Sequence, residues 1–193
     1  MDGPVEVRSP GPVGSGGSGA VGDSVVDRRH HGGYDQALYG YAREDLDAWA
    51  AELGRELRSG TFGENLTTSG LDVSGARIGE RWRIGNDVIV EVSVPRIPCR
   101  TFAWMLGEQG WIKRFTERAV PGTYLRVIEP GPVRAADPIE VVSVPDHDVT
   151  VALTFRALTL EPELLPALLV ADALPEEVKQ SARRRTGVAL DAD

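Results

Sequence analysis

The chain has 193 residues, a formal net charge of −8 and a single cysteine. A negative net charge argues against non-specific nucleic-acid binding, which needs a positively charged surface. No segment approaches the roughly 20 apolar residues of a membrane helix, and no basic patch followed by an apolar run indicates a secretory signal. We therefore expect a cytoplasmic protein that keeps its thiol reduced and binds neither nucleic acid nor membranes.

The first 22 residues are rich in glycine, serine and proline, and they are predicted to hold a first strand and a flexible loop. The segment from Gly14 to Gly19 formally matches the glycine pattern of a dinucleotide-binding loop. That pattern works only when a helix follows, because the helix N-terminus binds the pyrophosphate. Here Gly22-Asp23 and the β-branched pair Val25-Val26 follow instead, so we reject a dinucleotide site.

Two periodicities follow along the chain. Residues 43 to 58 carry an apolar stripe at helical spacing, which predicts a helix that ends at Ser59-Gly60 and buries Trp49 in the core. From Arg81 to Val94 apolar residues alternate, interrupted by the turn sequence Gly85-Asn86-Asp87. This second pattern predicts a β-hairpin.

A second helical pattern covers residues 102 to 119, with a break expected around 107 to 110. Strand patterns return at 123 to 129 and at 138 to 144, separated by Pro130-Gly131-Pro132. Short strands interleaved with a few helices predict a mainly β (α+β) fold, a β-barrel with helices covering its ends.

After Pro145 the pattern changes to three short helical stretches, at about 148 to 159, 161 to 171 and 175 to 186. The predicted organisation is therefore an N-terminal segment over residues 1–22, a barrel domain over 23–145 and a small helical extension over 146–193.

The single cysteine, Cys99, lies in the segment Pro95-Arg96-Ile97-Pro98-Cys99-Arg100, directly after the alternating pattern. Neighbouring arginines favour the thiolate form, which is the form that attacks electrophiles and binds metals. A lone cysteine can equally be a small buried hydrophobic residue. Cys99 alone does not decide between these two interpretations.

Cys99 belongs to a longer series of motifs. Six occur between about residues 7 and 143: Ser9-Pro10-Gly11, Gly22-Asp23, His30-His31-Gly32-Gly33, Gly63-Glu64-Asn65-Leu66, Pro95-Arg96-Ile97-Pro98-Cys99 and Gly122-Thr123-Tyr124-Leu125-Arg126-Val127. In this order they resemble the motifs of the MOSC family (molybdenum cofactor sulfurase C-terminal domains), in particular its bacterial YiiM-like branch. The resemblance implies a MOSC-like β-barrel capped by helices and followed by a three-helix extension.

The resemblance also implies a cofactor, molybdopterin-bound molybdenum. Such a group needs a soft anionic ligand for the metal, hydrogen-bonding groups for the pterin and positive charge for the phosphate. The matching family cysteine is the metal ligand or the sulfur carrier, and this role transfers to Cys99, with Glu64 as a second catalytic residue. The cofactor-binding set implied by the motifs is His30, His31, Gly32, Gly33, Gly63, Asn65, Arg96 and Arg100.

Several of these residues have structural alternatives. Asn65 could form an Asx-turn or a cap, and Glu64 could be the salt-bridge partner of an arginine instead of a proton donor. His30 and His31 are adjacent, so in an extended segment they point to opposite faces and are poor candidates for a shared metal site. We expect Cys99, Asn65 and the histidine-glycine segment to line one pocket, with an arginine of the cysteine motif near its rim.

The function implied by the resemblance is reduction of small N-hydroxylated compounds, such as hydroxylaminopurines or amidoximes. Electrons would come from a separate flavin or iron–sulfur reductase, because one cysteine cannot hold an iron–sulfur cluster. The alternative is a sulfur carrier whose Cys99 persulfide comes from a cysteine desulfurase, in which case pyridoxal phosphate (PLP) belongs to that partner. A third interpretation is a cofactor-binding or storage protein without turnover.

Overall fold

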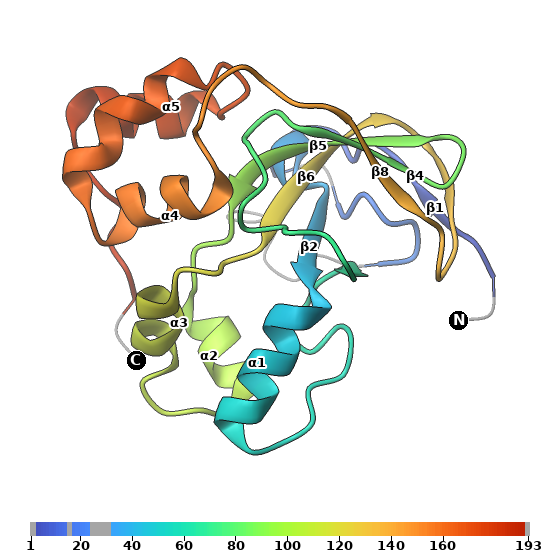
Figure 1. The fold of residues 1–193 in the computed structure, drawn as a ribbon, viewed down its shortest axis with the longest axis horizontal. Helices are drawn as coiled ribbons and strands as arrows, with labels where there is room; N and C mark the ends of the chain where they lie inside the picture. Colours follow the sequence, from blue (N-terminus) through green and yellow to red (C-terminus); the bar gives the residue numbers. More distant parts are fainter. Residues whose placement is uncertain (1–2, 15–16, 24–31, 192–193) are drawn as a thin grey trace.

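A computed structural model describes residues 3–14, 17–23 and 32–191 of the chain. The centre of the molecule is a curled six-stranded sheet with helices packed beside it and beyond one end (Figure 1). Its strands are β2 (Leu38–Ala42), β3 (Leu66–Thr68), β4 (Arg81–Ile84), β5 (Val88–Pro95), β6 (Thr123–Glu129) and β8 (Ile139–Ser143). They lie in the order β3-β2-β6-β5-β4-β8, and only the β2–β3 pair is parallel.

The prediction of an α+β fold with a barrel-like sheet is confirmed, in the form of a half-barrel. The pairing of β5 with β6 shifts register between Ile89 and Val90 and again between Val92 and Val94. Such irregularities increase the local twist and bend the strands. The sheet therefore curls around its apolar face.

The predicted hairpin is confirmed, since β4 and β5 are antiparallel and join through Gly85 to Asp87. The segment Pro130-Gly131-Pro132 was predicted only to separate two strands, and this was incomplete. Strand β7 (Gly131–Val133) pairs with β1 (Val5–Val7) in a two-stranded sheet. Proline fits there because β7 is an edge strand, where a missing N–H costs no ladder hydrogen bond.

Three helices, α1 (Arg43–Leu53), α2 (Arg100–Leu106) and α3 (Trp111–Arg118), lie beyond one end of the sheet (Figure 1). Helix α1 ends earlier than the predicted residue 58. Gly54 adopts a left-handed conformation (φ 64°) and donates its N–H to the Ala50 carbonyl, which closes the helix. The predicted break between α2 and α3 is confirmed.

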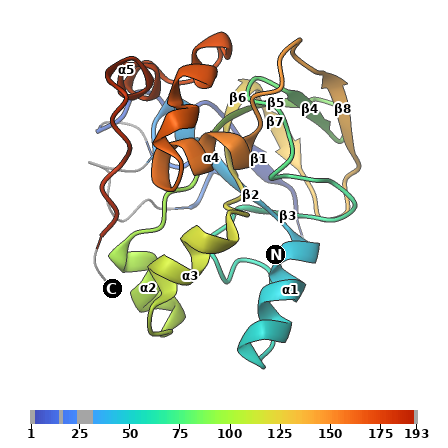
Figure 2. The same cartoon turned by 60° about the vertical axis from the view of Figure 1, so that its left-hand side comes forward.

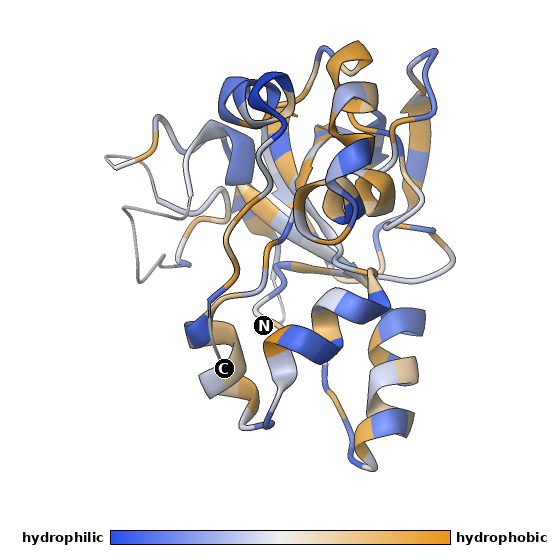
Figure 3. Cartoon of the chain, turned by 90° about the vertical axis from the view of Figure 1, so that its left-hand side faces the viewer, coloured by the Kyte–Doolittle hydropathy of each residue, from blue (hydrophilic) through white to orange (hydrophobic). Residues whose placement is uncertain are grey.

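The three helical stretches predicted after Pro145 are also present: α4 (Val151–Thr159), η2 (Pro162–Val170) and α5 (Glu176–Arg184). The middle one is a 3₁₀ helix with Pro166 inside it, because proline cannot donate the hydrogen bond of a regular α-helix interior. These helices lie beside the sheet, and the chain after α5 returns to the level of α2 (Figures 2 and 3). We call residues 146–191 the extension.

Two clusters of buried side chains hold the molecule together. The aliphatic core joins the sheet to the extension and includes Val90, Val92, Leu125, Leu158, Leu165, Leu168 and Val178. The aromatic core lies among α1, α2 and α3 and includes Tyr39, Tyr41, Trp49, Phe62, Phe102, Trp111, Phe115 and Phe155. The extension therefore shares a core with the sheet, and the predicted burial of Trp49 is confirmed.

Candidate functional site

Cys99 lies at the junction of a strand and a helix. Strand β5 ends at Pro95, and Cys99 is the N-cap residue of α2, with extended backbone angles. Its carbonyl accepts a hydrogen bond from the Ala103 N–H at 3.1 Å. The residue is half-buried and packs against the aromatic core. The thiol therefore sits on a well-supported part of the backbone.

Arg96, one of the two arginines of which either was predicted near the rim of the site, lies against two aromatic rings. Its guanidinium carbon lies 3.9 Å from the ring centroid of Phe102 and 4.9 Å from that of Tyr39. Its Nη1 also donates a hydrogen bond to the Phe62 carbonyl. A planar, weakly hydrated guanidinium suits such a position, where it gains cation–π attraction from both rings.

Two tyrosines accompany Arg96. Burial raises the pKa of Tyr39 and of Tyr124, and the nearby Arg96 charge only partly opposes this effect. Both phenols are therefore neutral at neutral pH, and the Tyr39 hydroxyl donates to the Pro121 carbonyl at 2.7 Å. Cys99 interacts electrostatically with both Arg96 and Tyr124. A thiolate at Cys99 would thus be stabilised by the arginine charge.

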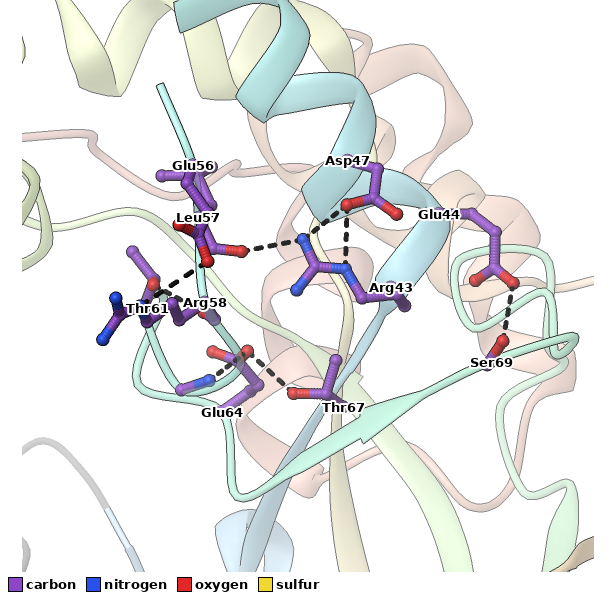
Figure 4. A network of polar contacts seen from close by, with 11 residues as sticks. Arg43, Glu44, Asp47, Glu56, Leu57, Arg58, Thr61, Glu64, Thr67 and Ser69 are labelled. Atoms are coloured by element: carbon purple, nitrogen blue, oxygen red, sulfur yellow. Dashed lines mark hydrogen bonds and ion pairs between the residues drawn. The ribbon is translucent and has the colours of Figure 1, made fainter. Parts of the chain in front are cut away.

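Glu64 holds together the loop that precedes β3 (Figure 4). Its carboxylate accepts hydrogen bonds from the Gly60 N–H at 2.6 Å, the Phe62 N–H at 2.9 Å and the Thr67 hydroxyl at 3.0 Å. The residue is only 7% exposed. These contacts tie the loop to itself and to Thr67 of β3, and they differ from the arginine salt bridge considered as an alternative. A role in proton transfer stays a prediction.

Asn65 connects this loop to the neighbouring strand. Its side-chain oxygen accepts from the Tyr39 N–H at 2.8 Å, and its amide nitrogen donates to the Asp23 carboxylate at 2.9 Å. Its own N–H donates to the Tyr39 carbonyl at 2.9 Å. The preceding Gly63 is left-handed (φ 75°), as the turn requires. These long-range contacts are neither the Asx-turn nor the cap considered as an alternative, and contact of Asn65 with a pterin stays a prediction.

The histidine-glycine segment is only partly visible, because His30 and His31 lie outside the described residues. Gly32 and Gly33 both have positive φ angles. A Cβ on Gly33 would lie 2.5 Å from the Val13 Cγ2, so no other residue fits. These glycines lead into the short helix η1 (Tyr34–Gln36).

The Gly-x-Tyr-x-Arg motif, from Gly122 to Arg126, contacts β2 and η1. A Cβ on Gly122 would lie 2.5 Å from the Tyr41 ring, so glycine lets β2 pass closely. Arg126 pairs with Asp35 of η1 at 2.5 Å and with Glu91 at 3.0 Å. The motif therefore anchors η1 to the sheet beside Tyr124.

Arg100 has a different environment from Arg96. It lines an open hollow of about 770 Å³ formed by α2 and the loop after it, together with Trp104, which is 82% exposed. Its backbone N–H donates to the Asp191 carboxylate at 3.0 Å. Arg96 and Arg100 were both predicted to bind the cofactor, but their environments differ. Arg96 lies against the aromatic core, whereas Arg100 lies on the surface.

The residues around Cys99 suit a cofactor that brings its own sulfur ligands. Within residues 3–14, 17–23 and 32–191, no group of three or more His, Cys, Asp or Glu side chains could hold a metal ion. A metal already bound by a pterin dithiolene needs only one soft protein ligand, and the Cys99 thiolate beside Arg96 meets that need. The Cys99 thiol thus fits the metal of a molybdenum cofactor, whereas binding of its pterin and phosphate by this chain stays a prediction.

Four aromatic residues next to Arg96 were not predicted as site residues: Tyr39, Phe62, Phe102 and Tyr124. One signal could have revealed part of this set. The segment Leu38-Tyr39-Gly40-Tyr41-Ala42 alternates two tyrosines in a strand pattern directly before the predicted helix. The contacts themselves join residues far apart in the sequence, and periodicity does not report such contacts.

Residues 27–140 match the family model described as the MOSC domain. The chain is 33% identical over 135 residues to the uncharacterized protein YflK of Bacillus subtilis (strain 168), which covers 70% of this chain and 61% of that protein. It is 35% identical over 128 residues to the protein YiiM of Escherichia coli (strain K12), covering 65% and 57%. A protein of Gibberella moniliformis named "Reductase" is 31% identical over 142 residues, which are 70% of this chain and 24% of that protein.

The fold is similar to solved structures over nearly its whole length. The crystal structure of YiiM from E. coli has a TM-score of 0.77 and 28% identity, covering 96% of this chain and 86% of that one. YiiM from Geobacillus stearothermophilus has a TM-score of 0.74 at 23% identity, covering 96% and 98%, which shows the fold alone. The chain spans about three fifths of the length of the curated bacterial relatives that it matches. No helix of the described residues is long and apolar enough to cross a bilayer.

Proposed function

Because the chain belongs to the MOSC domain family, we propose that it is a molybdenum-cofactor-dependent reductase of N-hydroxylated compounds, with Cys99 as the protein ligand of the metal. The observation that carries the proposal is the position of Cys99: a half-buried thiol at the junction of β5 and α2, packed against the aromatic core and three residues from Arg96. A cation in this position favours the thiolate that a soft metal prefers. The fungal relative named "Reductase" supports the same class of reaction.

When bound, the cofactor would supply two electrons for the reaction. An amidoxime would take up two electrons and two protons, its N–O bond would break, and an amidine and one water would leave. Cys99 would bind the metal through Sγ, and Arg96 would hold the thiolate in its charged form. The aromatic core beneath Cys99 would exclude water from one side of the site.

The electrons would come from a separate flavin or iron–sulfur reductase, since this chain has only one cysteine. We propose a cytoplasmic location, because a single free thiol fits a reducing compartment.

A sulfur carrier is the second candidate function, because a persulfide on Cys99 would also be an anion stabilised by Arg96. A cysteine desulfurase with its own pyridoxal phosphate would then be the partner.

The experiment compares two conditions for the wild-type chain made in a cofactor-competent host. In one, reduced methyl viologen and benzamidoxime are supplied; in the other, a cysteine desulfurase and cysteine. We expect benzamidine formation in the first condition, and persulfide on Cys99 only in the second would favour the sulfur carrier.

Two variants connect either result to the thiol. Cys99→Ser should lower benzamidine formation by orders of magnitude, because the soft ligand is lost. Thr101→Ser is the matched control, since Thr101 is an exposed neighbour on α2, and it should keep full activity. Unchanged reduction in Cys99→Ser would remove Cys99 from the proposal.

A further inference from the structure

Helix α2 presents two large apolar side chains to solvent. Trp104 is 82% exposed, the highest value for a large hydrophobic residue in the described part of the chain, and the adjacent Met105 is 54% exposed. Trp104 also borders the open hollow of about 770 Å³, which Arg100 and the loop after α2 line as well. Exposed apolar groups rimmed by polar ones mark interaction sites. We call Trp104, Met105 and the residues that line this hollow the α2 face.

The α2 face is held rigidly from beneath. Phe102 and Leu106, on the inner side of the same helix, are buried in the aromatic core. Arg55 donates a hydrogen bond to the Leu106 carbonyl at 2.7 Å and pairs with Glu108 at 3.1 Å, so it joins the last turn of α2 and the following loop to the end of α1. A surface that is already ordered loses little conformational freedom when a partner binds.

The α2 face begins at the thiol. Cys99 is the N-cap residue of α2, and Arg100 is its first residue. Trp104 lies five residues further on, which is a rise of about 7.5 Å along a helix. A protein that covers Trp104 and Arg100 would therefore lie directly beside Cys99.

The charges around the α2 face favour an acidic partner. Five basic and four acidic side chains lie on or next to it, although the whole chain has a net charge of −8: Arg55, Arg100, Lys113, Arg114 and Arg118, with Glu52, Glu108, Glu117 and Asp191. The three glutamates are all in ion pairs, and the Asp191 carboxylate accepts the Arg100 N–H.

The Arg100 guanidinium, by contrast, has no ion-pair partner among the described residues, and it is exposed at the hollow. A guanidinium in this position can bind a carboxylate through two hydrogen bonds. A symmetric dimer through the α2 face would instead bring two copies of Arg100 together, so these charges disfavour a second copy of this chain as the partner.

We propose that the α2 face is the docking surface for the protein that supplies electrons at Cys99, and that this partner presents carboxylates around its flavin or iron–sulfur centre. Arg100 would pair with one carboxylate, and apolar side chains of the partner would cover Trp104. For each substrate molecule two electrons would leave the partner, which is oxidised, and the N–O bond would be reduced. The identity of the partner as an electron donor rests on the proposed function, whereas the docking surface itself does not.

Binding to two acidic electron-transfer proteins, a flavodoxin and a plant-type [2Fe–2S] ferredoxin, tests the surface without any turnover. Interferometry with the purified full-length chain at low ionic strength should detect binding to at least one of them. Trp104→Ala should weaken this binding about tenfold, because a central tryptophan commonly dominates an interface, and its melting temperature should stay near that of the wild type because the side chain is exposed.

Val170→Ala is the matched control, because Val170 is 62% exposed but lies on η2, and it should bind like the wild type. Absence of binding to both proteins, or wild-type affinity in Trp104→Ala, would overturn the proposal. Self-association of the chain alone that is lost in Trp104→Ala, measured by sedimentation velocity, would assign the surface to a second copy and would also overturn it.

Two opposite charges at one position test the sign of the partner's charge. Gln109 is exposed and lines the hollow. Gln109→Lys should tighten binding and Gln109→Glu should weaken it, each about threefold, because charges at the edge of an interface steer association. The difference should shrink as ionic strength rises, since salt screens exposed charges. The reverse order of affinities would contradict an acidic partner.

The failures of the two proposals are distinguishable. In the loaded enzyme, Trp104→Ala should slow benzamidoxime reduction by the bound protein donor but not by reduced methyl viologen, because a small dye needs no docking surface. An equal loss with both donors would overturn the docking role. Reduction by methyl viologen without Trp104-dependent binding would overturn the surface and leave the proposed function in place. Trp104-dependent binding without reduction by either donor would support the surface and contradict the proposed function.

Discussion

The aliphatic core and the aromatic core of this protein have different roles. The aliphatic core joins the sheet to the extension, mainly through branched side chains. The aromatic core holds the Arg96 guanidinium against Tyr39 and Phe102 and supports Cys99. The comparison indicates that one core mainly provides stability, whereas the other also sets the environment of the thiol.

The largest expected effect separates the two cores directly. Phe102→Ala and Leu168→Ala should each lower the free energy of unfolding by about 3–5 kcal/mol, because each empties a fully buried position. Only Phe102→Ala should change the rate at which iodoacetamide alkylates Cys99 in the folded protein, since Phe102 stacks on Arg96. Urea unfolding and alkylation kinetics measure the two quantities. Equal alkylation rates in the two variants would show that the cores do not differ in this way.

Arg96→Met should lower the free energy of unfolding by about 2–3 kcal/mol, because a hydrogen bond and two cation–π contacts are lost. It should also slow alkylation of Cys99, because the thiolate loses its nearby cation. Arg96→Lys keeps the charge and should retain more of the alkylation rate than of the stability. Faster alkylation in Arg96→Met than in the wild type would contradict the assigned electrostatic role.

A smaller loss is expected at the loop before β3. Glu64→Gln keeps the shape of the side chain but replaces one acceptor oxygen with a donor, so one of three hydrogen bonds is lost. The free energy of unfolding should fall by about 1–2 kcal/mol. Glu56→Gln, at an exposed position of the preceding loop, is the control and should have almost no effect. A stable Glu64→Gln variant that lacks reductase activity would instead support the predicted proton-transfer role.

The smallest effect concerns pH and two neighbours on α1. Burial, with the nearby Asp72 charge, raises the pKa of Asp45. The contribution of Asp45 to folding stability is therefore fully present below the pKa that it has in the unfolded chain, and it is lost as the pH rises through its pKa in the folded protein. Asp45→Asn should therefore raise the melting temperature at pH 7 but not at about pH 3. The Gly70 N–H lowers the pKa of Glu44, so Glu44→Gln should lower the melting temperature at pH 7. Calorimetry at both pH values checks the opposite signs, and a shared sign would contradict them.

The sequence predicted the elements of the aliphatic core well, because its strands alternate and its helices repeat at 3.6 residues. The hairpin over β4 and β5 and the three helices after Pro145 were all recovered. The bounds were less accurate where backbone conformation decides, as at Gly54, which ends α1 before residue 58. Strand β7 was missed because the sequence Pro130-Gly131-Pro132 indicates a turn, whereas pairing with the distant β1 makes Gly131–Val133 a strand.

The candidate site was predictable as a list of residues but not as an arrangement. The motifs drew attention to Cys99, Arg96, Glu64 and Asn65, and the structure shows that the last two make extensive contacts within the protein. The spacing of the motifs in the sequence did not indicate that Arg96 lies against the Tyr39 and Phe102 rings. Such contacts depend on long-range packing, which local patterns do not encode.

Metal binding by Cys99 is tested most directly by the molybdenum and pterin content of the full-length chain purified from a cofactor-competent host. We expect close to one molybdenum and one pterin per wild-type chain. In Cys99→Ser the molybdenum content should be much lower, while the melting temperature of the cofactor-stripped variant equals that of the stripped wild type. Sulfane sulfur on Cys99 without molybdenum or pterin in the wild type would contradict the assignment of Cys99 as a metal ligand.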